Sequence, residues 1–314
     1  MVIRLLILAA TLGWQPPRAA AQGLPPYHPT NPLLTSRSGL YFQPYLDRGK
    51  AWEARVVMDY ASLVEFAEVP GASMVLDAEI LRTEATITRN LGAGFVALSG
   101  SFGGAYDGFM DGALDWYHNL TGLRVKAREI RPKNRYDYLI ALPGDTIAVP
   151  KSGAFIGDLR IVAGHRHTRH WQSAVSVTLP TGPTGFGREV ASVSAVTTVR
   201  TTPNRRLVGE FSAGVGYAPA TGPLRAFQET DFHHVSGGVR YRFWGRQAAF
   251  VNLFYQSRNY QATRMRTLDQ REVTLDYGFL LRAKKGPEWF LGMTEDLEPK
   301  GPAIDLSLRI GARW

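Results

Sequence analysis

The segment Ile304–Trp314, IDLSLRIGARW, decides the fold class of this chain of 314 residues. Successive side chains of a β-strand point to opposite faces, so alternation of apolar and polar residues predicts a strand with one apolar face. The segment is as long as a transmembrane strand of about 9–11 residues. Because the final residue is aromatic, we expect the barrel-assembly machinery to read Trp314 as an insertion signal. The apolar positions are Ile304, Leu306, Leu308, Ile310, Ala312 and Trp314.

The same alternation recurs along the preceding half of the chain. It is found in the segments Phe155–Ala163, Leu207–Tyr217, Val235–Phe243 and Val273–Leu281. The connections between the expected strands alternate in length. The short ones are 164–169, 201–205, 244–246 and 283–286, and the long ones are 180–189, 218–232, 258–270 and 295–301. Short turns on one side and long loops on the other are typical of bacterial outer-membrane barrels.

Aromatic residues gather at the ends of the expected strands, as the interfacial girdles of a membrane barrel require. They are Trp171, Tyr217, Phe243, Trp244, Trp289 and Trp314. A soluble β-sandwich, or a soluble periplasmic binding protein closed over an apolar interior, also alternates and stays an alternative. The girdles and the loop lengths favour an all-β, closed, antiparallel, up-and-down transmembrane β-barrel in the bacterial outer membrane.

The N-terminal third is less regular. Its candidate strands are Trp52–Tyr60, Met74–Asn90, Phe95–Phe102 and Asn134–Ala141. The apolar parity slips by one position between Ile80 and Leu81, which predicts a bulge or a turn there. Bacterial barrels have even strand numbers, and the candidates together give an odd one. Either Leu40–Tyr45 is a further strand or one candidate is false, so we expect twelve or fourteen strands.

The beginning of the chain has the pattern of a cleaved export signal. A basic start, the apolar run Leu5–Trp14 and the small residues Ala19–Ala21 predict removal of residues 1–21. The mature chain, 22–314, is expected to form one barrel domain exported through the inner membrane. The absence of cysteine excludes disulfide scaffolds, thiolate metal sites and cysteine nucleophiles.

The most unusual segment is DGFMDGALDWYHNL, residues 107–120, which predicts a short helix within an insertion spanning 103–133. A helix would place Asp107, Asp111, Asp115 and His118 on one face. Three carboxylates and an imidazole can bind a divalent cation. We favour the simpler interpretation: these residues form the polar side of an amphipathic helix packed against the barrel mouth or plugging its lumen. The sequence therefore predicts no metal site.

A basic segment follows that helix, within 123–135. In an outer membrane it is a candidate for contact with lipid and lipopolysaccharide phosphates, although a segment that lines the lumen or a solvated loop has the same composition. The candidate residues are Arg124, Lys126, Arg128, Arg131 and Lys133. An exported protein with no recognition motif is not expected to bind nucleic acid. The oligomeric state is left open.

Charged residues of both signs fall on the polar faces of the expected strands. In a closed barrel they point into the lumen, and mixed signs predict salt-bridge networks that fill a narrow lumen. Twelve or fourteen strands lie between the small filled barrels and the open porins. These residues are Asp158, Arg160, Glu210, Arg240, Arg242, Glu272, Asp276, Asp305 and Arg309.

No catalytic motif is present: the chain contains neither G-x-S-x-G nor H-E-x-x-H. No catalytic residue or cofactor is therefore predicted, and the protein is expected not to be an enzyme. We expect a narrow channel or a structural surface protein. The alternative is an outer-membrane lipid-acting hydrolase with a Ser/His site, such as His234 with Ser236, or a carboxylate–metal site at the barrel rim.

The chain resembles a bacterial family known only as domain-of-unknown-function family 3187. The landmarks run in order along most of the mature chain. They are Asn31–Leu33, Gly103–Gly108, Asp115–His118, Gly122–Leu123, Arg131–Arg135, Gly153, Gly157–Asp158, Leu179–Gly182 and Thr294–Leu297. The resemblance implies an outer-membrane barrel and no activity, because the family has none assigned.

Overall fold

The structure is a computed structural model that describes residues 23–47, 50–121, 131–188, 190–201, 206–283, 285–298 and 306–314. The predicted export signal therefore lies outside the described residues.

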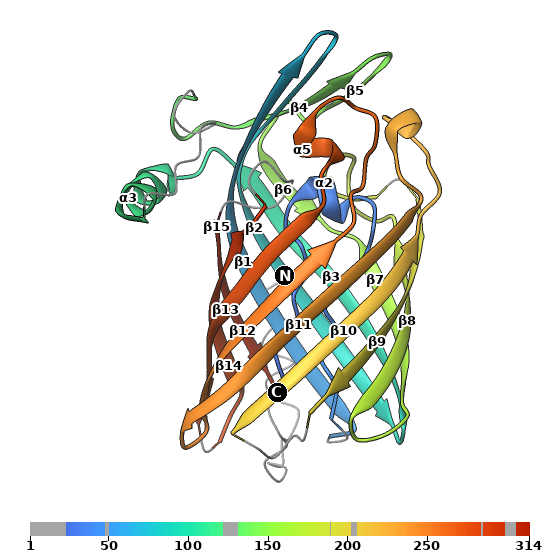
Figure 1. Cartoon of the computed structure of the whole chain (residues 1–314), viewed down its shortest axis with the longest axis vertical. Coiled ribbons are helices and arrows are strands. Elements are labelled where there is room, and N and C mark those ends of the chain that lie inside the picture. Colours follow the sequence, from blue (N-terminus) through green and yellow to red (C-terminus); the bar gives the residue numbers. More distant parts are fainter. Residues whose placement is uncertain are drawn as a thin grey trace.

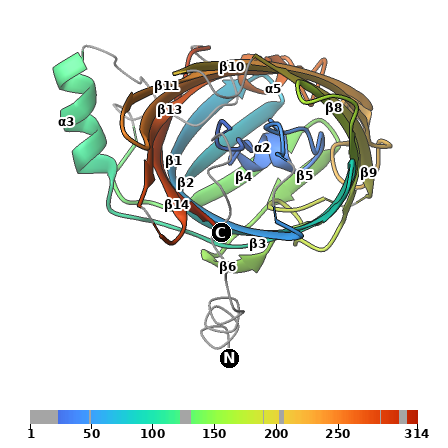
Figure 2. The same ribbon diagram turned by 90° about the horizontal axis from the view of Figure 1, so that it is seen from below.

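Twelve antiparallel strands close into a barrel (Figures 1 and 2). Each strand pairs with its neighbour in sequence, and the ring closes where the first strand pairs with the last. The predicted closed up-and-down barrel is confirmed, with the smaller of the two expected strand numbers. The ring strands are β1 (Trp52–Val69), β2 (Ala72–Leu91), β3 (Gly94–Tyr106), β7 (Leu159–Arg166), β8 (Trp171–Leu179), β9 (Ser192–Arg200), β10 (Leu207–Tyr217), β11 (Asp231–Trp244), β12 (Gln247–Gln256), β13 (Glu272–Arg282), β14 (Glu288–Asp296) and β15 (Leu306–Arg313).

Three further strands extend the sheet outside the ring. The hairpin β4 (Asp137–Leu142) and β5 (Asp145–Ala148) pairs with the first residues of β2, and β6 (Gly153–Ile156) pairs with the last residues of β3. The candidate Asn134–Ala141 is thus a strand of this extension rather than of the barrel. Leu40–Tyr45 forms no strand, only an isolated bridge between Tyr27 and Phe42.

The predicted bulge or turn between Ile80 and Leu81 is absent, because β2 pairs with β1 in one unbroken register. Its even-numbered side chains face inward over the whole length. Near the membrane-spanning part these are polar, as at Glu84 and Thr86, whereas toward the loops they are apolar, as at Met74 and Leu76. The parity slips in the sequence because the surroundings of the two faces exchange. Toward the loops the inner face packs into an apolar cluster, and on the outer face Asp77 binds Arg131 and Glu79 binds the Tyr60 hydroxyl.

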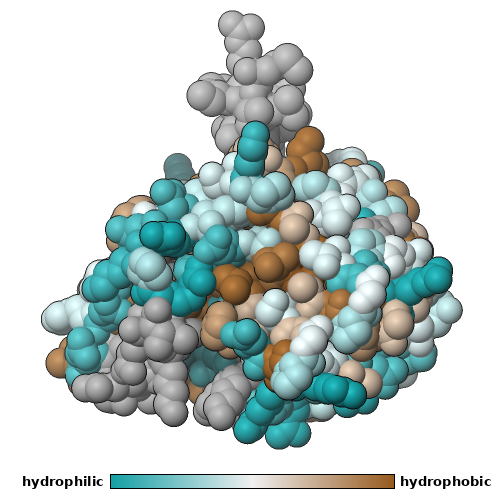
Figure 3. All heavy atoms as spheres, turned by 90° about the horizontal axis from the view of Figure 1, so that it is seen from above, coloured by the Kyte–Doolittle hydropathy of each residue, from teal (hydrophilic) through white to brown (hydrophobic). Residues whose placement is uncertain are grey.

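The two ends of the barrel differ as predicted. Short turns join the strands at one end, the turn end, and longer segments join them at the other, the loop end (Figure 1). Exposed tryptophans gather at the turn end, at Trp52, Trp171, Trp244 and Trp289. The short elements α2 (Pro32–Thr35), η1 (Arg225–Phe227) and α5 (Arg266–Asp269) lie at the loop end. Side chains cover this end when it is seen from above, with hydrophobic ones toward the centre (Figure 3).

The predicted helix is α3 (Asp111–Thr121), and it lies outside the barrel (Figures 1 and 2). Met110 and Leu114 pack against Leu306, Tyr60 and Met293 of the barrel wall. The insertion is therefore placed beside the barrel, and α3 does not plug the lumen. No helix among the described residues is long and apolar enough to cross a membrane.

The lumen is instead filled by residues 23–47, which we name the plug. Figure 2 looks along the barrel and shows α2 and its neighbouring residues within the ring of strands. Leu24, Leu33 and Phe42 are at most 2% exposed although they precede the first strand. Several prolines interrupt the plug, which favours its irregular backbone. The sequence analysis did not predict this segment.

Candidate functional site

The lumen side chains that were predicted to form salt-bridge networks also hold the plug. Glu210 is buried and its carboxylate accepts hydrogen bonds from the backbone N–H groups of Leu24, at 3.4 Å, and Tyr45, at 3.1 Å. An irregular buried backbone needs such partners, because it has no strand ladder to satisfy it. The Glu210 carboxylate therefore supplies the hydrogen-bond acceptors that a neighbouring strand would supply in a sheet.

A second group of charged residues lies across the lumen. Arg309 forms ion pairs with Asp59 and Asp276, both at 2.7 Å, and donates to the carbonyl of Pro26 at 2.8 Å. The two aspartates therefore share one guanidinium, which in turn holds the plug.

Glu272 provides another contact between wall and plug. It accepts a hydrogen bond from the Tyr27 hydroxyl at 2.9 Å and one from Thr274 at 2.7 Å. The plug is thus held by a side-chain contact as well as by backbone contacts.

The loop end of the barrel grips the upper part of the plug. Asn259 donates from one amide nitrogen to the carbonyls of Leu33 and Leu34, each at 2.8 Å. Arg37 of the plug donates to the carbonyls of Ala218, Pro219 and Glu229, which belong to the loop between β10 and β11.

The turn end closes on the last residues of the plug. Arg166 is 1% exposed and donates to the Leu46 carbonyl at 2.5 Å. Arg200 forms an ion pair with Asp47 at 2.5 Å, and its guanidinium lies 3.7 Å from the ring centre of Tyr45. These polar contacts add to apolar ones, because Leu24, Tyr27 and Phe42 of the plug share a buried cluster with Phe250, Phe254 and Phe290 of the wall.

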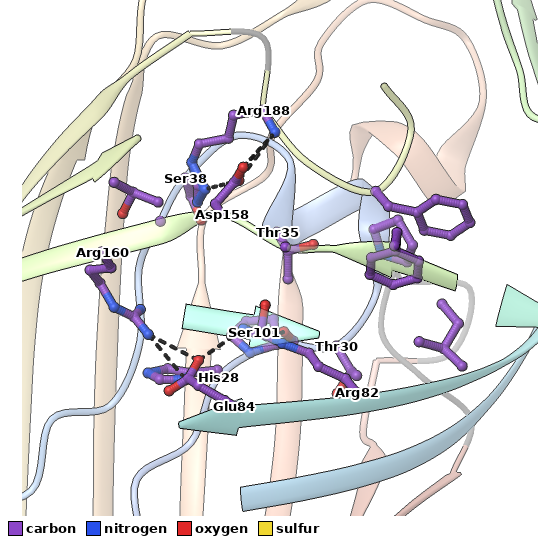
Figure 4. Close-up of a pocket in the computed structure, with 18 of the residues that line it drawn as sticks. His28, Thr30, Thr35, Ser38, Arg82, Glu84, Ser101, Asp158, Arg160 and Arg188 are labelled. Carbon is purple, nitrogen blue, oxygen red and sulfur yellow. Dashed lines mark hydrogen bonds and ion pairs between the residues drawn. The ribbon is translucent and has the colours of Figure 1, made fainter. Parts of the chain in front are cut away.

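A polar pocket lies between the plug and the wall formed by β2, β3 and β7 (Figure 4). With the open solvent at its edge it has a volume of about 700 Å³. The plug contributes His28, Thr30, Thr35 and Ser38, and the wall side contributes Arg82, Glu84, Ser101, Asp158, Arg160 and Arg188.

Ion pairs organise this pocket. Glu84 lies 3.0 Å from Arg82 and 3.1 Å from Arg160, and Asp158 lies 3.0 Å from Arg188. Asp158 also accepts from the backbone of Gly182 at 2.9 Å, so it fixes the loop after β8. Burial lowers the pKa of Arg188 to about 10, which leaves it charged at neutral pH.

His28 marks the narrow point of the pocket, with its Nδ1 atom 2.8 Å from Glu84. Burial and the nearby Arg160 lower the pKa of His28 to about 3, against the attraction of Glu84. The imidazole is therefore neutral at physiological pH and donates its Nδ1–H to the carboxylate.

A second space continues from this point toward the turn end, and we name it the lower chamber. It shares His28 and Arg160 with the polar pocket and has a volume of about 280 Å³, open solvent included. Its other lining residues are Tyr41, Gln43, Leu46, Arg55, Thr86, Thr88, Ala97, Ser99 and Val162. The two spaces form one polar lane between the plug and one side of the barrel.

The lane is lined by four arginines, Arg55, Arg82, Arg160 and Arg188, and two carboxylates, Glu84 and Asp158. With His28 neutral, positive charge exceeds negative charge. The sequence analysis selected Asp158 and Arg160 but missed the other charged or titratable residues of the lane, which are His28, Arg55, Arg82, Glu84 and Arg188. Arg55 lies on the polar face of the expected strand Trp52–Tyr60, so alternation alone was a usable signal for it.

The acidic cluster of the insertion is dispersed. Asp107 precedes α3 and is exposed, whereas Asp111 accepts from the Asn134 backbone at 2.6 Å and Asp115 forms an ion pair with Lys133. The side chain of His118 lies outside the described residues. Among those that are described, no three His, Asp or Glu side chains are grouped so as to hold a metal ion.

The basic segment is described only in part. Arg124, Lys126 and Arg128 lie outside the described residues. Arg131 forms ion pairs with Asp77, at 2.8 Å, and with Asp137, and Lys133 pairs with Asp115 as noted above. These two cations are therefore engaged with carboxylates of the same region.

The remaining predicted lumen residues lie at different depths. Arg240 is 3% exposed, whereas Arg242 is exposed near the turn end of β11. Asp305 lies outside the described residues. Trp314 continues the last strand, and its backbone N–H donates to Ala54 at 2.9 Å.

His234 lies in the lumen and not on the lipid side. It is 1% exposed, stacks on Phe254, and places Nε2 3.4 Å from the Ser212 hydroxyl. Its Nδ1 atom has no hydrogen-bond partner among the described residues, so a third, orienting group of a triad is absent from them. Ser236, the partner considered from the sequence, is also buried.

The fold is similar to that of solved outer-membrane proteins. The COG4313 outer membrane channel from Pseudomonas putida F1 matches with a TM-score of 0.53 and 10% identity over 86% of this chain and 99% of that chain. The NanC porin matches with a TM-score of 0.47 and 7% identity, over 83% of this chain and 98% of that one. The β domain of the Bordetella autotransporter BrkA matches with a TM-score of 0.46 and 12% identity, over 84% and 99%.

No family model matches the sequence, and no curated protein matches it. The resemblance to domain-of-unknown-function family 3187 therefore stays a prediction. At such low identities the likeness to the P. putida channel shows the fold alone, which is that of an outer-membrane β-barrel.

Proposed function

We propose that this protein is a narrow outer-membrane channel that the plug closes in the conformation described here. The polar lane carries the proposal, because it places charged and hydroxyl side chains along a plug that hydrogen bonds and ion pairs join to the wall. A structural surface barrel would need neither a polar lane nor a separate segment that fills its lumen. The fold it shares with the P. putida channel supports this choice.

Hydrolase activity receives no comparable support. The described His234–Ser212 pair is buried in the lumen, and in the insertion Asp111 binds the Asn134 backbone and Asp115 pairs with Lys133. We also propose that the barrel resides in the outer membrane, inserted by the assembly machinery, with α3 at the lipid surface, where Trp116 and Leu120 are exposed.

A disulfide lock tests the closure by the plug. A Cβ atom placed on Gly39 would lie 2.9 Å from the Ser192 hydroxyl oxygen on β9, within the reach of a disulfide. Gly39 has a positive φ of 61°, so a cysteine there is strained by about 1–2 kcal/mol, which the bond can tolerate. The chain has no other cysteine to compete. In planar bilayers, oxidised Gly39→Cys/Ser192→Cys protein should show no openings, and reductant should restore them.

A variant that weakens the attachment of the plug tests the proposal in the opposite direction from the disulfide lock. Asn259→Ala leaves the buried carbonyls of Leu33 and Leu34 without their donor, at a penalty of about 1–3 kcal/mol. The open population should rise about tenfold, since 1.4 kcal/mol is a factor of ten. Arg258→Met, at an exposed loop arginine paired only with Glu229, is the matched control and should leave conductance unchanged. Absence of conductance in every variant, including Asn259→Ala, would overturn the proposed function.

A further inference from the structure

The lower chamber contains a buried cation that forms no ion pair with a described residue. Arg55 on β1 is 8% exposed, and its Nε atom has no hydrogen-bond partner among the described residues. No described carboxylate lies within ion-pair distance of its guanidinium. A guanidinium carries five N–H donors and stays protonated, so it cannot escape this situation by losing a proton.

The carboxylates nearest to Arg55 are already engaged. Glu84 is shared by His28, Arg82 and Arg160. The residue paired with Arg55 across the β1–β15 ladder is Arg313, another cation, which forms its own ion pair with Glu288 at 2.7 Å. Glu53 and Glu84 attract Arg55 electrostatically, but neither of them forms an ion pair with it.

A second donor lines the same space. The hydroxyl of Tyr41, from the plug, is buried, and its polar neighbour in the wall is Ser176. The Tyr41 ring lies beneath the guanidinium of Arg160, at 4.2 Å from its centre, which adds a further positive charge beside the chamber. A buried cation that forms no ion pair and a buried hydroxyl line one space, and together they form a site that suits a negatively charged acceptor.

We propose that the lower chamber binds a small monovalent anion between Arg55 and Tyr41. The lower chamber is the smaller of the two spaces, about 280 Å³ against about 700 Å³ with open solvent included, which favours an anion of halide or formate size. The positive lane above it, with its excess of arginine over carboxylate, concentrates anions at the entrance. The anion is then also the permeant solute, and this last step alone rests on the proposed channel function.

Bromide is the probe for binding. Crystals of the full chain in sodium bromide should show an anomalous peak in the lower chamber beside Arg55. The thermal unfolding temperature should rise in bromide compared with gluconate at equal ionic strength, because a ligand bound only by the native state stabilises it. Arg55→Met, which keeps the length of the side chain and removes its charge, should lose both effects. Arg258→Met should keep both.

Permeation is measured separately, from reversal potentials in a potassium chloride gradient. The wild-type channel should prefer chloride, and Arg55→Met should lower the chloride-to-potassium permeability ratio about tenfold, as expected for one unit charge removed from a partly desolvated site. Arg55→Lys should retain most of the preference.

The outcomes separate the two proposals. Bromide bound in the lower chamber of a protein that does not conduct would overturn the proposed channel function and support the anion site. Conductance without chloride preference, together with an empty chamber in bromide or a peak that survives Arg55→Met, would overturn the anion site and keep the channel.

Discussion

At the scale of single residues, the protein uses buried charge to hold backbone rather than to catalyse. Arg309 lies between Asp59 and Asp276 with all three side chains almost inaccessible to solvent, and it also donates to Pro26. A buried ion triad stabilises little in itself, because desolvation opposes the attraction between the charges. Removing only one member of the triad nevertheless lowers the stability of the protein, because the remaining charges stay buried without their counter-charge.

This reasoning predicts the behaviour of Arg309 variants. Arg309→Met should lower the free energy of unfolding by about 3–5 kcal/mol, because two carboxylates lose their shared counter-charge. The triple variant Arg309→Met/Asp59→Asn/Asp276→Asn should recover most of that loss. Urea-induced unfolding in lipid vesicles measures both. Equal stability of the single variant and the wild type would show that the aspartates are not buried as charges.

At the scale of elements, the insertion between β3 and β4 is an attachment to the outside of the barrel. Tyr106, the last residue of β3, lies opposite Glu79 on β2, and Asp137, the first residue of β4, lies opposite Asp77 on the same strand. The two ends of the insertion are therefore close together, and a short Gly/Ser linker can join them.

Replacement of residues 107–136 by such a linker should leave the fold and the conductance unchanged, because α3 packs outside the lumen. Bilayer recordings and heat-modifiable migration on gels check the two expectations. A linker variant in which the sequence of residues 138–142 is also scrambled is the contrasting variant. It should lose stability, because Tyr138 and Ile140 belong to the apolar cluster at the loop end. A large rise in conductance from the first replacement would mean that the insertion obstructs the pore.

At the scale of the whole molecule, closure depends on plug and barrel together, and acid should weaken it. Burial holds the pKa of His28 at about 3 in the closed form, whereas a released plug returns it to its ordinary value near 6.5. The released state binds more protons between these values, so the closed state is fully favoured above pH 6.5 and loses stability as the pH falls below it.

The open population should therefore rise about 30-fold between pH 7.5 and pH 5, as linkage of one such group gives. Single-channel open probability across this range measures the effect. The charged groups facing His28 are Glu84 and Arg82 on β2, Arg160 on β7 and Arg55 on β1, and Tyr41 is its ring neighbour in the plug. Because these other groups can also respond to pH, His28→Gln is the decisive control. If it keeps the full acid response, another group is responsible.

The barrel could be predicted because each strand and each loop carries its own pattern in the sequence. Alternation in Ile304–Trp314 and its upstream counterparts reports a sheet with one face toward lipid, and loop lengths report which end is which. The same alternation placed Glu210, Glu272, Asp276 and Arg309 toward the lumen, where the structure has them. It failed on β2 only because the apolar face changes sides along one straight strand.

The plug and the polar lane required the tertiary structure. Residues 23–47 have no periodic pattern, because their irregular backbone is satisfied by side chains more than a hundred residues away, such as Glu210, Asn259 and Arg309. The sequence by itself determined a transmembrane sheet and the charges inside it. Only the closed barrel showed that those charges bind the plug. Contacts between segments that are distant in the sequence produce no periodic pattern in either segment, so the sequence alone does not reveal them.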